Sequence, residues 1–142
     1  MKIAVAGLGY VGLSNAVLLA QNHQVFGFDV LQERVDQLNE RKSPIVDAEL
    51  ESFLENNRLN LFATIDPILA FTDAKYVIVA TPTNYDENTN YFDTSSVEEV
   101  LIQVRDTNPD ATIVIKSTIP VGFVDDISAR LNVKNVIFSP EF

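Results

Sequence analysis

The sequence contains no cysteine and very little histidine. None of its 142 residues is Cys, and His23 is the single histidine. The lack of Cys excludes disulfides, thiolate metal ligands and a cysteine nucleophile within this chain. One imidazole cannot assemble a zinc cluster, and we therefore predict no metal site.

Basic residues are scarce as well. Ten Lys and Arg residues stand against twenty Asp and Glu residues, which gives a formal net charge of −10. Nucleic acids and anionic membrane surfaces bind proteins that present a basic face. We therefore expect neither nucleic acid nor membrane as a partner.

Long apolar runs are also missing. No stretch approaches the roughly 18 to 20 residues that a bilayer-spanning helix needs. The N-terminal MKIAVAG has one Lys and a short apolar run that ends at Gly7, unlike the long apolar core of a signal peptide. We therefore expect a cytoplasmic protein.

What the sequence does contain is a regular alternation of strand and helix patterns. Short Val- and Ile-rich runs predict six strands, at 2–6, 24–28, 59–64, 76–80, 112–116 and 135–139. Amphipathic stretches predict helices at 10–22, 31–42, 47–57 and 122–131, and another that begins at residue 95. A short turn or helix is expected at 66–71. Such strands, alternating with helices, are typical of a parallel sheet covered on both faces. We predict an α/β fold, a doubly wound parallel sheet of the Rossmann type, with one dinucleotide-binding domain over residues 1–142.

A polar segment separates the fourth predicted strand from the next helix. Residues 81–93, TPTNYDENTNYFD, are expected to form a long loop, and long loops in compact domains are often functional. The spacing of Ser95 and Glu98 predicts a capping box at the start of the helix that follows.

The most specific motif is Gly7-Leu8-Gly9-Tyr10-Val11-Gly12, which follows the first strand and opens the first helix. In such a turn the first glycine permits a tight exit from the strand, the second lets a pyrophosphate approach the backbone, and the third lets the helix pack closely on the sheet. The N–H groups and partial positive charge of the helix N-terminus then bind the phosphates. Because this site uses local dipoles, a chain of net charge −10 can still bind an anionic dinucleotide. A glycine-rich turn without a ligand is the alternative.

Asp29 is the second candidate residue. It ends the second strand, 22 residues after Gly7, close to the spacing of about 20 at which a carboxylate binds the adenosine ribose. A carboxylate here repels a 2′-phosphate, which favours NAD over NADP. Arg34 complicates this preference because an Arg can accommodate a 2′-phosphate; we expect it over the adenine or near the ribose. The alternatives are a strand-end cap for Asp29 and a solvated helix position for Arg34.

Three further candidates follow later strands, where open α/β sheets bind their ligands. Thr83 follows the fourth strand and can hydrogen-bond the second half of the cofactor. Thr118 follows the fifth strand and is expected near the nicotinamide, where its hydroxyl can orient a substrate or a water; Gly122 in the same segment is expected to permit a close approach. Glu141 follows the last strand and is expected to point toward the crevice. The alternatives are an ordinary turn for Thr83, a helix cap for Thr118 and a solvated terminal acid for Glu141.

Several segments together resemble the NAD-binding domain of the UDP-glucose/GDP-mannose dehydrogenase family. The matching segments cover essentially the whole chain: KIAVAGLGYVGL, VIVATPTNYD, NYFDTSSVE, KSTIPVGF and FSPEF. The NYFDTS segment is the most discriminating. It is more similar to bacterial members that act on UDP-glucose than to those that act on GDP-mannose or UDP-N-acetylmannosamine.

The resemblance implies an NAD-dependent oxidation of the C6 alcohol of UDP-glucose to the carboxylate of UDP-glucuronate, a precursor of polysaccharides such as capsules. The reaction uses NAD twice and passes through a thiohemiacetal and a thioester. By the family's motifs, the pyrophosphate is held by Gly7, Gly9, Tyr10, Val11 and Gly12.

The resemblance also assigns roles to the other candidates. Asp29 and Arg34 hold the adenosine end of NAD, and Thr83 contacts the cofactor. Thr118 is a polar catalytic helper that also contacts the cofactor near the nicotinamide. Glu141 is an acid/base or substrate-contact residue.

One departure from the family is large. Its nucleophilic cysteine, catalytic lysine and sugar-binding residues belong to central and C-terminal UDP-sugar-binding domains, which this chain lacks. The resemblance therefore implies a chain that binds NAD without turning over UDP-glucose by itself. Family dimers form largely through a central helix that is also outside the matched segments, so we expect a homodimer for the full-length enzyme and leave the state of this chain open. Two other functions stay open: a dehydrogenase for UDP-N-acetylmannosamine or GDP-mannose, and a non-catalytic module that senses the NAD/NADH ratio.

Overall fold

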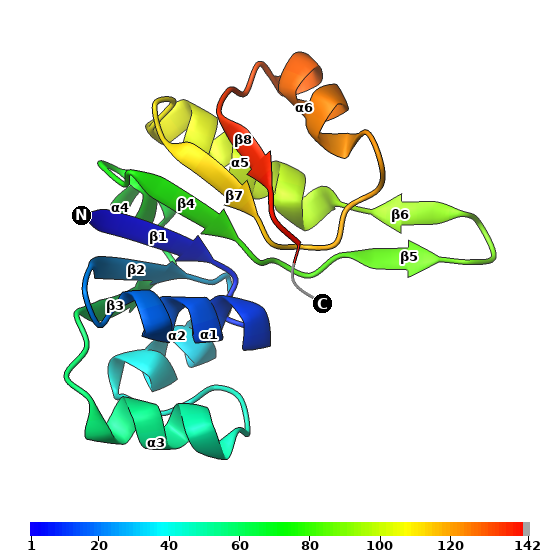
Figure 1. Cartoon of the computed structure of the whole chain (residues 1–142). Coiled ribbons are helices and arrows are strands. Elements are labelled where there is room, and N and C mark those ends of the chain that lie inside the picture. The colour runs from blue at the N-terminus through cyan, green and yellow to red at the C-terminus, as the bar shows by residue number, and fades with distance from the viewer. Residues whose placement is uncertain (141–142) are drawn as a thin grey trace.

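A computed structural model describes residues 1–140 of the chain. Its centre is a six-stranded sheet with helices on both faces (Figure 1). The elements follow in the order β1 Lys2–Ala6, α1 Tyr10–Leu19, β2 Gln24–Phe28, α2 Gln32–Asn39, α3 Ala48–Asn56, β3 Leu61–Thr64, α4 Pro67–Phe71, β4 Tyr76–Val79, β5 Asn84–Asp86, β6 Tyr91–Asp93, α5 Ser95–Thr107, β7 Thr112–Ile115, α6 Phe123–Leu131 and β8 Val136–Phe138.

The main sheet has the strand order β3-β2-β1-β4-β7-β8, and every neighbouring pair is parallel. From β1 the chain proceeds to β2 and β3 on one side, then returns to place β4, β7 and β8 on the other side. The direction of winding therefore changes between β1 and β4. Sheets of this order bind ligands in the crevice at the carboxyl ends of the strands that flank such a switch. The predicted fold class, a doubly wound parallel sheet, is confirmed.

Each face of the sheet has its own helical layer. Side chains alternate between the two faces along each strand. Ile3 and Val5 of β1 pack with α1, α2 and α3, whereas Ala4 and Ala6 pack with α4, α5 and α6. Because both faces are covered, the central strands are apolar apart from residues at their ends, such as Lys2, which is the pattern that predicts a parallel sheet.

The segment expected as a long loop is instead largely a β-hairpin. β5 and β6 pair antiparallel, with Tyr85 opposite Phe92. The two rings meet across the pair with 5.7 Å between their centroids. Cross-strand aromatic pairs stabilise hairpins, and the many polar residues around this pair mask its strand pattern.

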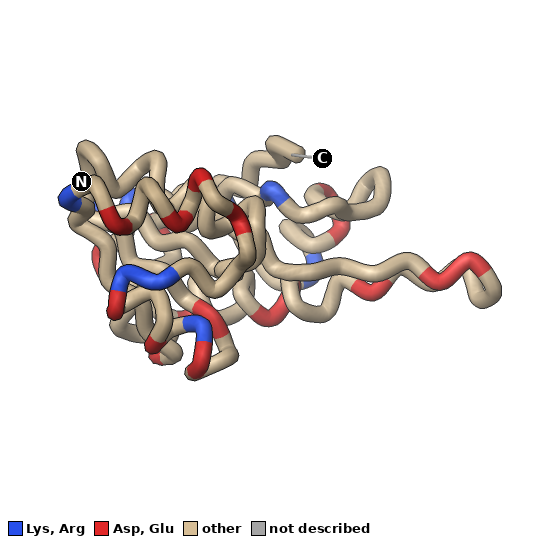
Figure 2. Tube along the Cα trace, turned by 90° about the horizontal axis from the view of Figure 1, so that it is seen from below, with Lys and Arg blue, Asp and Glu red and all other residues tan. Residues whose placement is uncertain are grey.

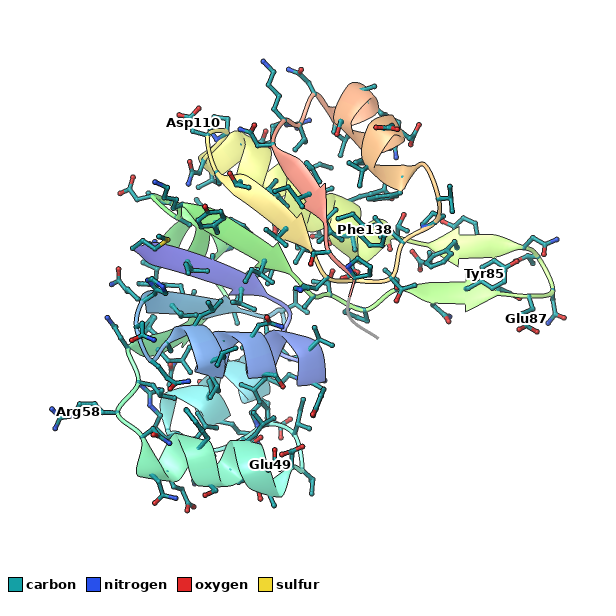
Figure 3. All side chains as sticks on the ribbon, in the orientation of Figure 1. Glu49, Arg58, Tyr85, Glu87, Asp110 and Phe138 are labelled. Atoms are coloured by element: carbon teal, nitrogen blue, oxygen red, sulfur yellow. The ribbon has the colours of Figure 1, made fainter. Side chains whose placement is uncertain are left out.

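The hairpin projects from the body of the domain (Figure 1). Its residues include Asp86, Glu87 and Asp93 but no Lys or Arg, so the projecting arm is acidic (Figure 2). The side chains of Tyr85 and Glu87 lie out on this arm, away from the sheet (Figure 3).

Two helices end earlier than their sequence patterns predict. α1 ends at Leu19 and α2 ends at Asn39, rather than at residues 22 and 42. After α2 the backbone of Arg41 has a φ of +61°, a left-handed conformation through which a right-handed helix cannot continue. The helix therefore stops at Asn39, ahead of the Ser43-Pro44 pair, where the proline disfavours a helical conformation of the residue before it.

The capping box predicted at Ser95 and Glu98 is wrong. α5 begins at Ser95 with Thr94 at its N-cap, and the Thr94 side chain makes no capping hydrogen bond to the backbone. Glu98 accepts a hydrogen bond from the hydroxyl of Thr94 at 3.1 Å. The N–H of Ser95 is accepted by the carboxylate of Asp93 at 3.0 Å.

Gly122 has a backbone conformation that favours glycine. A side chain at this position would meet no protein atom within 4 Å, so no contact within the domain itself requires a glycine there. Its φ of +82° at the N-cap of α6 is a left-handed conformation that favours glycine.

Candidate functional site

The turn between β1 and α1 leaves no room for a side chain at two of its three glycines. Gly7 has a φ of +95°, and a Cβ there would lie 2.6 Å from the carbonyl oxygen of Ala80. A Cβ on Gly12 would lie 1.7 Å from the carbonyl oxygen of Gly7. The turn thus has the tight exit predicted for Gly7 and close packing at Gly12, here against the turn itself.

Gly9 differs from the other two glycines. A Cβ built at Gly9 meets no atom within 4 Å, so nothing in the protein itself fills this space. Gly9 also lines an open cleft. The missing side chain leaves the backbone of the turn accessible from the cleft, which fits a ligand group that approaches the backbone closely.

The start of α1 offers free hydrogen-bond donors. Gly9 is the N-cap, no side chain caps this helix, and its first turn holds no acidic residue. The first intrahelical bond runs from Leu13 N to Gly9 O at 2.8 Å, so the N–H groups ahead of Leu13 have no partner within the helix. In α3, by contrast, the Asp47 carboxylate accepts from Leu50 N. The N-terminus of α1 can therefore donate to an anion and stabilise it with the helix dipole.

Asp29 connects the glycine turn to the loop after β2. Its side chain is only 6% exposed, and its two carboxylate oxygens accept hydrogen bonds from Leu8 N at 2.9 Å and from Leu31 N at 3.0 Å. Arg34 Nη1 lies 3.5 Å from Oδ2. The capping role that the sequence offered as an alternative is therefore present, and the same residue also lines the cleft.

The glycine turn, Asp29 and Arg34 all border one cleft of about 570 Å³, within the size range of small-molecule sites. It lies at the switch point between β1 and β4. Its lining residues come from the turn after β1 (Gly7, Gly9, Tyr10, Val11), the end of β2 and the start of α2 (Phe28, Asp29, Val30, Leu31, Arg34), the segment after β4 (Ala80, Thr81, Pro82) and α5 (Ser96, Glu99, Val100, Gln103). The structure thus brings six of the predicted cofactor-binding residues together and packs Gly12 beside them.

The remaining predicted residues are placed differently. Thr83 lies half-buried just before β5 and Thr118 is exposed after β7; neither lines the cleft. Both belong to the carboxyl edge of the sheet, where the hydroxyl of Ser117 donates to Thr81 O at 2.7 Å and ties the ends of β4 and β7 together. Glu141 lies outside the residues that the structure describes.

The wall of the cleft that α5 provides was not predicted from the sequence. Ser96, Glu99, Val100 and Gln103 are spaced by 3, 1 and 3 residues and so share one helical face, which lines the cleft. From the sequence, this segment was predicted as an amphipathic helix with a capping box at its start, and none of these four residues was assigned to the site. Polar residues on the side of an amphipathic helix are usually solvated, and only the fold shows that these residues of α5 face the cleft beside the glycine turn.

Two polar atoms at the cleft lack partners. Thr81 Oγ1 and Gln103 Oε1 are buried without a hydrogen bond, and both residues line the cleft. Buried polar atoms in folded proteins are almost always hydrogen-bonded. The two orphaned atoms therefore fit a site whose ligand supplies the missing partners.

Residues 1–140 contain neither a cluster of metal-binding side chains nor a membrane-spanning helix. No group of three His, Asp or Glu side chains there is arranged to hold a metal ion. No helix in that range is both long enough and apolar enough to cross a bilayer.

Comparison with known proteins agrees with this geometry. The chain matches the model of the UDP-glucose/GDP-mannose dehydrogenase family, NAD binding domain, over residues 1–142. It is similar to the UDP-glucose 6-dehydrogenases of Streptococcus pneumoniae, with 52% identity over all of this chain and 36% of the relative, and of Campylobacter jejuni, with 41% identity over all of this chain and 37% of the relative. The chain thus spans about a third of the length of these relatives.

Solved structures show the same relationship. A ternary complex of GDP-mannose dehydrogenase from Pseudomonas aeruginosa superposes with a TM-score of 0.86 at 29% identity, over all of this chain and 36% of that chain. A UDP-D-ManNAc dehydrogenase from Pyrococcus horikoshii gives a TM-score of 0.88 at 25% identity with the same coverage. NAD is thereby confirmed as the cofactor expected from the sequence, and the chain belongs to the UDP-glucose/GDP-mannose dehydrogenase family, as its NAD-binding domain.

Proposed function

We propose that this chain is the cofactor-binding part of an NAD-dependent UDP-glucose 6-dehydrogenase, which oxidises UDP-glucose to UDP-glucuronate. The main observation in support of this proposal is the composition of the cleft. An uncapped helix start, an open glycine backbone and a buried carboxylate surround one space at the switch point of the sheet. Of the substrates in the family, UDP-glucose is favoured by the 52% and 41% identities to UDP-glucose 6-dehydrogenases, against 36% to a GDP-mannose 6-dehydrogenase.

In this proposal the pyrophosphate of NAD lies on the turn that contains Gly7, Gly9 and Gly12, and the N–H groups at the start of α1 donate to it. Tyr10 and Val11 border the same space. No basic side chain is required, because backbone donors and the helix dipole neutralise the phosphates.

Asp29 is proposed to accept hydrogen bonds from the adenosine ribose while it holds Leu8 N and Leu31 N. A buried carboxylate repels a 2′-phosphate, and Arg34 offsets only part of that charge at 3.5 Å. The domain is therefore expected to prefer NAD to NADP.

Thr83 and Thr118 are proposed to contact the nicotinamide half of the cofactor. They lie at the carboxyl edge of the sheet, outside the cleft that the glycine turn borders, which suits the more distant half of a dinucleotide. When bound, NAD supplies the hydride acceptor for oxidation of the sugar alcohol. Thr118 is also proposed to act as a polar catalytic helper near the nicotinamide. Glu141 is proposed as an acid/base or substrate-contact residue.

About two thirds of the length of each of these relatives lies outside the region that this chain matches. We propose that central and C-terminal UDP-sugar-binding domains supply the nucleophile and the sugar site, and that the chain alone binds NAD without oxidising UDP-glucose. Fluorescence of NADH after addition of UDP-glucose and NAD tests this directly: no NADH should form with this chain. Steady NADH production by the chain alone would contradict it.

The cofactor preference is tested by calorimetric titration with NAD and NADP. We expect NAD to bind at least about tenfold more tightly, a difference of about 1.4 kcal/mol. Asp29→Asn should reduce this ratio because it removes the charge that repels the 2′-phosphate. Asp36→Asn, an exposed carboxylate on α2, is the matched control and should leave the ratio unchanged. Equal binding of NAD and NADP by the unmodified chain would contradict the role proposed for Asp29.

A further inference from the structure

The cleft contains a recognition element that the glycine turn and Asp29 do not account for. Gln103 projects from α5 onto the cleft, and its Oε1 is buried with no hydrogen-bond partner. Desolvation of a carbonyl oxygen without a partner is unfavourable, so this arrangement destabilises the domain unless something pairs with the oxygen.

The second orphaned atom lies in a different part of the cleft. Thr81 follows β4 directly beside the glycine turn, and its backbone nitrogen is 2.9 Å from the position that a Cβ on Gly7 would take. Thr81 Oγ1 is therefore near the part of the cleft where the phosphates are proposed to bind. Gln103, by contrast, lies two helical turns into α5.

The walls around Gln103 suit a flat aromatic base. Val100 precedes Gln103 by three residues on the same face of α5, and Val30 and Leu31 line the cleft from the loop after β2. With the pyrophosphate on the glycine turn and the ribose at Asp29, the base of the adenosine half extends into the space between that loop and α5. Apolar side chains there can cover the two faces of the ring, which leaves its polar edge to be matched by a side chain such as Gln103.

We propose that Gln103 is a base-recognition residue, whose Oε1 accepts a hydrogen bond from the 6-amino group of adenine. The inference rests on the proposed binding of NAD in this cleft. A carboxamide presents one acceptor and two donors in a plane, which matches the amino group and ring nitrogen on the edge of adenine. Recognition of this edge makes the site selective for an adenine dinucleotide over one with another purine.

Nicotinamide purine dinucleotide is the probe that isolates this contact, because a hydrogen replaces the 6-amino group while the ring nitrogens stay acceptors. The unmodified chain should bind NAD at least about tenfold more tightly than this dinucleotide, since only NAD supplies the amino group that donates to Gln103 Oε1. Gln103→Glu should keep this preference, because a carboxylate oxygen accepts from the amino group as the amide oxygen does.

Gln103→Leu completes the test, with dissociation constants measured by calorimetry on the 142-residue chain. This variant should bind NAD about tenfold more weakly than the unmodified chain and should bind the two dinucleotides equally. Gln24→Leu makes the same chemical change at an exposed position at the start of β2 and should behave like the unmodified chain. Circular dichroism establishes that each variant is folded.

The outcomes separate the inference from the function on which it rests. If the unmodified chain binds neither dinucleotide, the proposed function and the inference both fail. If the unmodified chain binds NAD but does not discriminate between the two dinucleotides, or Gln103→Leu binds NAD equally well, or Gln103→Glu loses the preference, the inference alone is overturned.

Discussion

At the scale of single residues, the three glycines of the first turn have separable physical roles. A Cβ on Gly12 would overlap the Gly7 carbonyl at 1.7 Å, whereas a Cβ on Gly9 would meet nothing within 4 Å. Gly9 also has a φ of −73°, which any residue adopts. Folding therefore requires a glycine at position 12, and only a ligand gives a reason for one at position 9.

This contrast makes a matched pair of alanine substitutions informative. Gly12→Ala should lower the free energy of unfolding by about 3 kcal/mol or more, because α1 must move off the turn to make room. Gly9→Ala should change it by less than about 1 kcal/mol while weakening NAD binding at least about tenfold, since the methyl group occupies the approach to the backbone. Urea denaturation measures the first quantity and calorimetry the second. A stable Gly9→Ala variant with undiminished NAD affinity would show that the pyrophosphate does not contact this turn.

Single residues also show where sequence analysis succeeds and where it stops. Gly7, Gly12 and Asp29 could be found because their roles depend on neighbours close in the chain or on a fixed spacing along it. Gln103 could not, because its place in the cleft depends on packing a helix against a turn about ninety residues earlier. Ser95 was misread as an N-cap because Thr94 has the same capping chemistry one residue away, and only the backbone decides between them.

At the scale of elements, the junction between the β5–β6 hairpin and α5 is held by local polar contacts. Asp93 ends β6, and its carboxylate accepts hydrogen bonds from both the N–H and the hydroxyl of Ser95. These bonds to Ser95 lower the pKa of Asp93 below its usual value. A carboxylate at the start of a helix also interacts favourably with the helix dipole.

The lowered pKa of Asp93 predicts a pH dependence for this junction. Because the folded pKa is depressed, the stabilisation is present above the unfolded pKa of about 3.9 and is lost as the pH falls through the folded value. Amide hydrogen exchange at the start of α5 should therefore be slow near neutral pH, after correction for intrinsic rates, and protection should fall at pH values below about 4. Asp93→Asn should remove most of this dependence. Protection that is the same in Asp93→Asn and the unmodified chain across this range would contradict the assignment.

The hairpin itself marks a limit of pattern reading at this scale. Its strands are three residues each, too short for a clear alternation, and their polar residues are typical of a loop. The strands of the main sheet were each found from their apolar runs. Most of them are buried on both faces, and even the three-residue β8 is apolar throughout.

At the scale of the whole molecule, an acidic chain binds an anionic cofactor by means of its topology. The net charge of −10 gives no general attraction for phosphates. The doubly wound sheet instead brings the start of α1, the end of β2 and one face of α5 around the same cleft. The donors are local and fixed by the backbone, so the overall charge and the binding site are independent properties of the fold.

The central claim is that NAD binds in this cleft with its phosphates on the glycine turn. Titration of the ¹⁵N-labelled chain with NAD, followed by amide chemical shifts in two-dimensional NMR spectra, tests it most directly. The account predicts that the largest shifts occur at Leu8 to Leu13, with further shifts at Asp29 to Leu31 and along the cleft-lining face of α5. Binding that leaves the amides of the glycine turn unshifted while others move, such as those around Pro109 and Lys134 at the opposite edge of the sheet, would contradict it.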